Sequence, residues 1–123
     1  MMSRRRTGGI LLPWLSAHVD GKEGRFLQIG NSLLLSKPFQ GLTSGAQILY
    51  LCMALESGGK PTVAFSRSTA AKYGISKNPF ARQVSELAAA GFIEVDRDGS
   101  YEQFKATVYR FTYSWKTKVP SQK

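Results

Sequence analysis

The segment 66–91, SRSTAAKYGISKNPFARQVSELAAAG, restricts the fold of this chain more than any other. Ser66 is a plausible N-cap for a short helix that Gly74 would end, because serine accepts amide hydrogen bonds and glycine adopts the left-handed conformation. Ser76 is predicted to be the N-cap of a second, longer helix, with its hydroxyl bonded to a backbone N–H two or three residues further on. Pro79 falls within its first turn, where the N–H that proline lacks would have no intrahelical acceptor. The pattern predicts two consecutive helices joined by a tight turn.

A pair of strands is predicted directly after the longer helix, which should end at Gly91. The remainder, FIEVDRDGSYEQFKATVYRFTY, alternates apolar and polar residues, which is typical of strands over 92–95 and 108–113. Asp98 and Gly99 mark a turn between the strands. The intervening stretch is long enough to form a loop that projects from the sheet.

An apolar helix is predicted upstream, in LTSGAQILYLCMALESGG. Thr43 or Ser44 is a plausible N-cap and Gly58 a plausible stop. Cys52 is interpreted as core filler rather than as a reactive thiol. The pattern is typical of a central helix that is buried on most sides. Its apolar side chains recur at i, i+3, i+4 and i+7, and three more widen the stripe: Ile48, Leu51, Cys52 and Leu55, then Leu49, Tyr50 and Met53.

Short strands are predicted on both sides of this apolar helix. Residues 61–65, PTVAF, are β-branched and aromatic and suit a short strand. Residues 24–39, GRFLQIGNSLLLSKPF, contain two short apolar runs around a Gly-Asn turn, so we expect a short hairpin or an irregular strand pair. The whole order predicts an α+β fold, a winged helix-turn-helix with a three-helix core, a small antiparallel sheet and a wing.

The stretches AAKYGISKNPFARQV and ELAAAGFIEVDRDG resemble winged helix-turn-helix DNA-binding domains, the second through its transition from recognition helix to wing. This resemblance covers roughly residues 42–113. The longer frame, from FLQIGNSLLLSKPFQGLTSGAQILYLCMAL onward, is similar to the N-terminal domains of replication initiators and related proteins on plasmids and mobile elements of Gram-positive bacteria. The resemblance implies sequence-specific binding of double-stranded DNA, in replication initiation or in transcriptional regulation of such an element.

The longer helix separates into two faces at about 100° per residue. The inner face is predicted to pack on the core and comprises Phe80, Val84 and Leu87, with Ala88 beside them. The outer face carries mostly short side chains and comprises Asn78, Arg82, Ser85 and Ala89, with Ala81 and Glu86 at its margins.

Four residues of the outer face are predicted to read DNA bases: Asn78, Ala81, Arg82 and Ser85. Arginine can bind guanine through two hydrogen bonds and asparagine can do the same with adenine, while alanine permits close approach or contacts a thymine methyl. Positions near the N-terminus of such a helix usually enter the major groove. A solvated helix face, to which alanine and serine are also suited, is the alternative.

Phosphate contacts are predicted around the two helix N-termini and in the wing loop. Serines at these positions can cap a helix and meet a phosphate, and lysine or arginine adds positive charge. The wing loop also carries Asp96, Asp98 and Glu102, and this mixed charge weakens its binding to DNA. For Tyr101, packing on the sheet is the alternative to a DNA contact. The predicted backbone-contacting residues are Ser66, Arg67, Ser68, Ser76, Lys77, Arg97 and Lys105. Simple solvation of these side chains is the alternative.

The net charge of +9, from 17 basic and 8 acidic residues, favours a polyanionic partner. Segments 1–25 and 100–123 carry net charges of +3 and +4, against +2 for 26–99. Most of the excess positive charge therefore lies in the two terminal segments, where it could follow a phosphate backbone.

Three regions are predicted from this distribution. They are a basic N-terminal arm over 1–25, the winged helix-turn-helix domain over 26–113 and a basic C-terminal tail over 114–123. We expect Arg4, Arg5 and Arg6 to form a tail that is disordered without DNA and that enters the minor groove with it.

Little in the sequence favours an enzyme. His18 is the only histidine and Cys52 the only cysteine, so neither a zinc site of the usual spacing nor an internal disulfide can form. GGKPT at 58–62 lacks the spacing of a phosphate-binding loop, and no nucleophile has a base partner at a recognisable spacing. No apolar run approaches the roughly 20 residues of a membrane span. We expect a cytoplasmic protein without catalytic activity, cofactor, metal or membrane contact.

A homodimer is also expected, because a single-domain DNA reader often needs a second copy to reach useful specificity. Trp14 and Trp115 lie near the termini and could pack on one another or form a dimer contact. The alternative to DNA binding is a winged-helix protein-interaction module. In that module the longer helix and the wing would contact a partner protein, and the positive terminal segments would serve solubility only.

Overall fold

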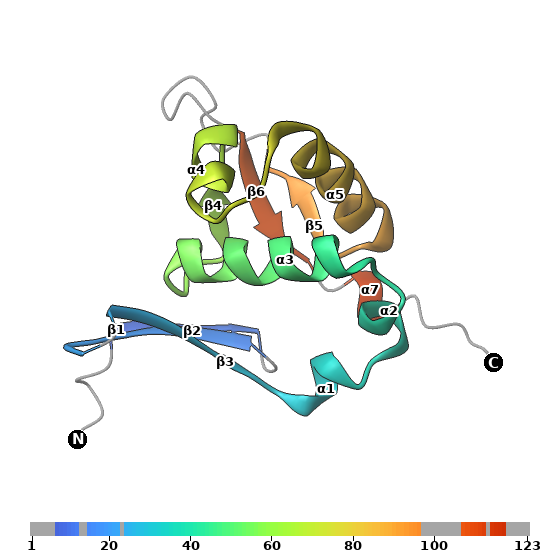
Figure 1. The fold of residues 1–123 in the computed structure, drawn as a ribbon. Helices are drawn as coiled ribbons and strands as arrows, with labels where there is room; N and C mark the ends of the chain where they lie inside the picture. Colours follow the sequence, from blue (N-terminus) through green and yellow to red (C-terminus); the bar gives the residue numbers. More distant parts are fainter. Residues whose placement is uncertain (1–6, 13–14, 23, 97–106, 113, 118–123) are drawn as a thin grey trace.

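The chain is arranged around one central helix, α3 (Ser44–Ser57) (Figure 1). The computed structural model describes residues 7–12, 15–22, 24–96, 107–112 and 114–117. A three-stranded sheet lies on one side of α3, and two helices with a second three-stranded sheet lie on the other. The architecture is α+β, as predicted. Within the described ranges no helix combines the length and the apolar character needed to cross a membrane.

The first sheet is an antiparallel meander whose strands pair in chain order: β1 (Thr7–Leu12), β2 (Leu15–Asp20) and β3 (Gly24–Ile29). Leu15 and Ala17 of β2 are buried. They pair with Ile29 and Leu27 of β3, which pack against the core. One face of the sheet is therefore apolar, and α3 lies against it.

The predicted basic arm over 1–25 is wrong for most of its length. Strands β1 and β2 occupy 7–12 and 15–20, and β2 buries Leu15 and Ala17 between the sheet and α3. Burial of apolar surface contributes about 25 cal/mol per Å², which favours a docked sheet over a free arm. Arg4, Arg5 and Arg6 lie outside the described residues, so their predicted role stays a prediction.

Two short helices, α1 (Asn31–Leu34) and α2 (Lys37–Gln40), connect β3 to α3. The predicted hairpin over 24–39 is therefore wrong in its second half, where no strand forms. The hydroxyl of Ser36 accepts the N–H of Phe39 at 3.2 Å and caps α2. Phe39 is buried in the core, so this capped turn places an aromatic ring beside α3.

Helix α3 begins and ends where the sequence predicts. Thr43 is its N-cap, and its hydroxyl accepts the N–H of Ala46 at 3.3 Å. Gly58 ends the helix in the left-handed conformation, with φ of 65°.

The buried face of α3 differs from the predicted stripe. Ile48 is 52% exposed, and Leu51, Cys52 and Leu55 are only half-buried. This partial burial still raises the pKa of the Cys52 thiol, in keeping with an unreactive side chain. Compared with the predicted orientation, α3 turns Tyr50 rather than Ile48 towards the core, where aromatic rings from other elements surround Tyr50. The buried side chains of α3 are those of Ala46, Leu49, Tyr50, Met53, Ala54 and Ser57.

The elements after α3 follow the predicted order. They are β4 (Thr62–Ala64), α4 (Arg67–Lys72), α5 (Lys77–Ala90), β5 (Ile93–Val95) and β6 (Val108–Phe111). All strand pairs are antiparallel, and the sheet order is β4-β6-β5, so the last strand lies in the middle. Strand β6 ends two residues before the predicted limit at 113.

The chain then turns into a short helix, α7 (Ser114–Thr117), so the predicted tail over 114–123 begins as packed structure. Trp115 is 1% exposed, and its ring stacks on Phe92 with centroids 4.9 Å apart. The backbone N–H of Trp115 donates to the carbonyl of Gly91 at 3.1 Å. Trp115 is therefore a core residue of its own chain and does not form the dimer contact considered above. Trp14 lies outside the described residues.

Substitution of Gly91 by alanine is expected to destabilise the fold strongly. Gly91 has φ of 89°, and an added Cβ would lie 2.8 Å from the backbone N of Trp115. A left-handed alanine and overpacking together should lower the free energy of unfolding by about 2–4 kcal/mol. Urea denaturation measures this loss.

Gly58→Ala is the matched control for this prediction. Gly58 also has positive φ, 65°, but an added Cβ there would meet nothing within 4 Å. Only the backbone penalty of about 1–2 kcal/mol should remain. Equal losses in the two variants would contradict a close approach of α7 to the end of α5.

Candidate nucleic-acid interface

The turn between α4 and α5 is short and is closed by backbone hydrogen bonds. Gly74 has φ of 82°, and its N–H donates to the carbonyl of Ala71 at 2.9 Å. The N–H of Ile75 donates to the carbonyl of Ala70 at 3.0 Å. This pair of bonds is a Schellman motif, which ends α4 sharply and lets α5 begin at Lys77.

The inner face of α5 is largely as predicted. Phe80 and Leu87 are buried, and the ring of Phe80 lies 5.8 Å from that of Phe65. Val84 is half-buried at the edge of the core. Helical periodicity places Ala88 beside the core face, but Ala88 is exposed in the structure.

The four predicted base readers, Asn78, Ala81, Arg82 and Ser85, are all exposed on one side of α5. Their exposure agrees with the predicted outer face, while their contact with DNA stays a prediction. Ala89 is exposed as well.

Glu86, at the margin of this face, has a structural role that the sequence did not reveal. Its carboxylate accepts the N–H and the hydroxyl of Thr43, both at 2.7 Å. The bond ties α5 to the N-terminus of α3, where a negative charge is favourable. No local pattern could have revealed a contact between residues 43 positions apart.

Three cationic side chains surround the N-terminal part of α5. Arg67, Lys77 and Arg82 are exposed, and none of them forms an ion pair with a residue that the structure describes. By contrast, Lys72 pairs with Glu56 at 2.8 Å. The charges of Arg67, Lys77 and Arg82 are therefore available to an external anion.

A hollow of about 410 Å³ lies between α4, α5 and β6, next to these charges. Phe80, Val84 and Tyr109 give it an apolar part, and burial raises the pKa of the Tyr109 hydroxyl, which therefore stays neutral. The remaining lining residues are the predicted contacts Arg67, Lys77, Asn78 and Ala81. The fold thus brings two predicted phosphate contacts and two predicted base readers to one site.

The serines at the two helix N-termini differ in their bonding. Ser66 caps α4, and its hydroxyl accepts the N–H of Thr69 at 3.2 Å and shares a hydrogen bond with Ser68 at 2.9 Å. Ser76 occupies the N-cap position of α5 but makes no side-chain cap bond, so that part of its prediction is wrong.

The physical reason is Pro79. The caps Ser36, Thr43 and Ser66 each accept the N–H of the third helical residue. In α5 this residue is Pro79, which has no N–H to donate. The hydroxyl of Ser76 is left exposed at the start of the helix, beside Lys77.

A polar network behind this surface holds α4 in place. The carboxylate of Glu56 accepts hydrogen bonds from Lys72 Nζ and from the Tyr73 hydroxyl, both at 2.8 Å. Arg25 of β3 donates to the carbonyls of Leu55 and Glu56 at the end of α3, at 3.3 and 3.0 Å. The network links β3, α3 and α4, and the sequence did not predict it.

The pKa values in this network follow from its bonds. Burial alone would raise the pKa of Glu56, but the hydrogen bonds from Lys72 and Tyr73 and the charges of Lys72 and Arg25 lower it below its usual range. Burial and the neighbouring Glu56 carboxylate raise the pKa of Tyr73. Glu56 is therefore ionised and Tyr73 protonated around neutral pH.

The wing residues Arg97, Tyr101 and Lys105 lie outside the described residues, so their predicted roles stay predictions. The strands that would carry the wing, β5 and β6, are described. Arg110 of β6 pairs with Glu94 of β5 at 2.9 Å and with Asp96, which follows β5, at 3.7 Å. The charge of Arg110 is thus compensated within the sheet.

Comparisons with known proteins leave the site to be interpreted from its geometry. No family profile, no curated protein and no solved structure matches this chain significantly. Across the ranges that the structure describes, no three His, Cys, Asp or Glu side chains lie close enough to hold a metal ion.

The two serines provide a paired test of the cap assignment. Ser66→Ala should lower the free energy of unfolding by about 1 kcal/mol, because it removes a bonded cap. Ser76→Ala should change it by only a few tenths of a kcal/mol, because no cap bond is lost. Urea denaturation of both variants measures the difference, and an equal loss would contradict the free hydroxyl of Ser76.

The Glu56 network predicts a pH-dependent stability. Glu56→Gln should lower the free energy of unfolding at pH 7 by about 1–2 kcal/mol, mostly through the Tyr73 bond, because Lys72 is 58% exposed and screened. Since the folded pKa of Glu56 lies below its unfolded value, this stability is present above the unfolded pKa and is lost as the pH falls through the folded pKa.

Urea unfolding of wild type and Glu56→Gln from pH 7 to pH 3 measures the effect, and the difference between them should shrink towards the acid end. Glu94→Gln is the matched control, because Glu94 is 52% exposed and pairs only with surface charge. Its loss should stay within about 0.5 kcal/mol at every pH. A difference for Glu56→Gln that did not change with pH would refute the assignment.

Proposed function

We propose that this chain binds double-stranded DNA through a winged helix, with α5 as the helix that enters the major groove. The order of elements supports this proposal: a helix, a strand, two helices joined by a tight turn, and two strands. The sheet order β4-β6-β5 brings the last two strands together, as a wing requires. The observation that carries the proposal is one surface on which an exposed face of α5 meets three positive charges that form no ion pair within the described ranges.

Base reading is assigned to the exposed face of α5. Arg82 can donate two hydrogen bonds to guanine and Asn78 can bind adenine in the same way. Ala81 and Ser85 are short enough to let the helix backbone approach the base edges. All four are free of the core contacts that fix Phe80 on the other side of the helix.

Phosphate binding is assigned to the N-terminal ends of α4 and α5. Arg67 and Lys77 line the same hollow, so they can hold one backbone strand while α5 lies in the groove. The Ser76 hydroxyl, which makes no cap bond because Pro79 lacks an N–H, is free to donate to a phosphate oxygen. Helix N-termini also favour anions through their unpaired amides.

The biological role proposed is replication initiation or transcriptional regulation of a plasmid or mobile element, in the cytoplasm. A homodimer would place two α5 helices on half-sites one helical turn of DNA apart, about 34 Å. If the fold served only as a protein-interaction module, the exposed face of α5 would contact a partner and the chain would not bind duplex DNA.

The test is duplex binding as a function of salt, first on random-sequence DNA and then on a sequence selected from it. Arg82→Ala should weaken binding to the selected duplex by about 1–3 kcal/mol and relax the preference at one base pair. Lys77→Ala should weaken binding to all duplexes alike and reduce the salt slope by about one.

Lys37→Ala is the matched control, because Lys37 is an exposed lysine on α2, which lies away from α4 and from the N-terminal end of α5 (Figure 1). It should leave both the affinity and the sequence preference unchanged. Absence of duplex binding at low salt, or an equal loss in Lys37→Ala and Lys77→Ala, would reject the proposed interface.

A further inference from the structure

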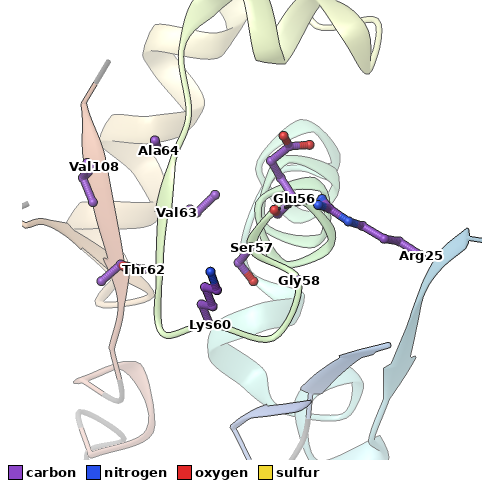
Figure 2. Close-up of a pocket in the computed structure, with 9 residues that line it drawn as sticks. All are labelled: Arg25, Glu56, Ser57, Gly58, Lys60, Thr62, Val63, Ala64 and Val108. Atoms are coloured by element: carbon purple, nitrogen blue, oxygen red, sulfur yellow. Dashed lines mark hydrogen bonds between the residues drawn. The ribbon is translucent and has the colours of Figure 1, made fainter. Parts of the chain in front are cut away.

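A second site lies at the edge of the second sheet, where β4 approaches the C-terminal end of α3 (Figure 2). A cleft of about 450 Å³ opens there. In Figure 2, Val63 and Lys60 point into the space between β4 and α3, and Arg25 reaches towards it from β3. None of the residues that line this cleft belongs to the proposed DNA surface. They are Arg25, Glu56, Ser57, Gly58, Lys60, Thr62, Val63, Ala64 and Val108.

The backbone of β4 is bonded on one side only. The N–H of Phe65 donates to the carbonyl of Thr107, and the N–H of Phe111 donates to the carbonyl of Pro61. Hydrogen-bonded and non-bonded pairs alternate along an antiparallel ladder, so Val63 is the β4 residue that bonds to β6.

Thr62 and Ala64 therefore direct their N–H and C=O groups away from β6, along the free edge of the sheet. Both residues line the cleft and are half-buried. No hydrogen bond from another described residue reaches their backbone groups. Natural proteins usually cover or shorten such an edge, because it can pair with another chain.

The charge around this edge is positive. Lys60 is exposed and forms no ion pair with any residue in the described ranges. Arg25 is held over the cleft by its bonds to the carbonyls of Leu55 and Glu56. The carboxylate of Glu56 is already engaged by Lys72 and Tyr73. An incoming carboxylate would thus meet the positive charges of Lys60 and Arg25. The negative charge of Glu56 would repel it little, because Lys72 already pairs with that carboxylate.

We propose that this edge binds an extended, acidic segment of a partner protein, which adds to the sheet as a strand beside β4. The free N–H and C=O groups of Thr62 and Ala64 would provide main-chain hydrogen bonds, and Lys60 and Arg25 would select carboxylate side chains. Apolar side chains of the segment would meet Val63 and Val108. The basic terminal segments of this chain have the wrong charge to occupy the cleft themselves.

This interaction does not depend on the proposed DNA binding. The exposed residues of α5 and the residues of the cleft do not overlap, so both surfaces can be occupied at once. A partner held at β4 would also touch the end of α3 next to Glu56, the residue that positions α4.

The probe is an acetylated and amidated pentapeptide of alternating glutamate and valine, titrated into the ¹⁵N-labelled full chain. The expected result is a saturable shift of the amide signals of Thr62 and Ala64, with slower hydrogen exchange at both. A peptide in which lysine replaces glutamate should give no such shift. Absence of a saturable shift with the acidic peptide would overturn the proposal. An equal shift with free glutamate would also overturn it, because the cleft would then bind a small anion and not a strand.

Lys60→Glu is the first variant, and it should weaken binding of the acidic peptide by about fivefold or more, because attraction becomes repulsion. Lys37→Glu makes the same change of charge on α2 and should leave the affinity unaltered. If both variants weakened binding equally, net charge alone would explain the binding, and the assigned edge would be wrong.

Ala64→Pro tests the backbone contribution. Proline there removes an N–H that points to the free edge and spares the ladder bonds of Val63. Binding should be lost while the urea midpoint shows that the fold is kept. Retained binding in a folded Ala64→Pro variant would overturn strand addition, and Lys60→Glu provides the test if the proline variant does not fold.

Discussion

The packing of Phe92 is the interaction on which the rest of the structure depends. Its side chain has no exposed surface, and its ring lies 4.9 Å from Trp115, 5.2 Å from Tyr50 and 6.1 Å from Phe39. These three rings come from α7, α3 and α2, so one residue joins the C-terminal helix to two helices that lie far from it in the sequence. Because Phe92 follows Gly91 directly, its burial also places the end of α5 beside α3 and α7.

Polar contacts then hold α5 and α4 in place on this aromatic core. Glu86 bonds to the start of α3 through Thr43, and Glu56 near the end of α3 bonds to Tyr73 after α4. Arg25 joins the first sheet to the same end of α3. Helix α3 is therefore a common support for the first sheet and for the two helices of the proposed DNA surface. The cleft at β4 opens at the end of α3 that carries Glu56, so both proposed surfaces are supported by α3.

Much of the local structure follows from short-range chemistry, and the sequence predicts it well. The limits of α3 and α5 are set by Thr43, Gly58 and Gly91, whose caps and left-handed conformations need only neighbouring residues. The free hydroxyl of Ser76 also has a local cause, since Pro79 occupies the position that would donate to it. A serine three residues before a proline was a readable signal, and it was missed. The exposed positions of Asn78, Ala81, Arg82 and Ser85 follow from helical periodicity alone.

The sequence by itself determined the α+β class, the order of elements from α3 to β6 and the outward face of α5, because caps, turns and periodicity act over a few residues. Only the tertiary structure decided that residues 7–12 and 15–20 form strands of a sheet that packs on α3, that Tyr50 rather than Ile48 faces the core, and that Trp115 is buried. Each of these outcomes depends on which apolar surfaces meet across long stretches of chain. Local composition does not encode that choice, since a basic segment such as 1–25 can be an arm or a sheet until another element covers its apolar side chains.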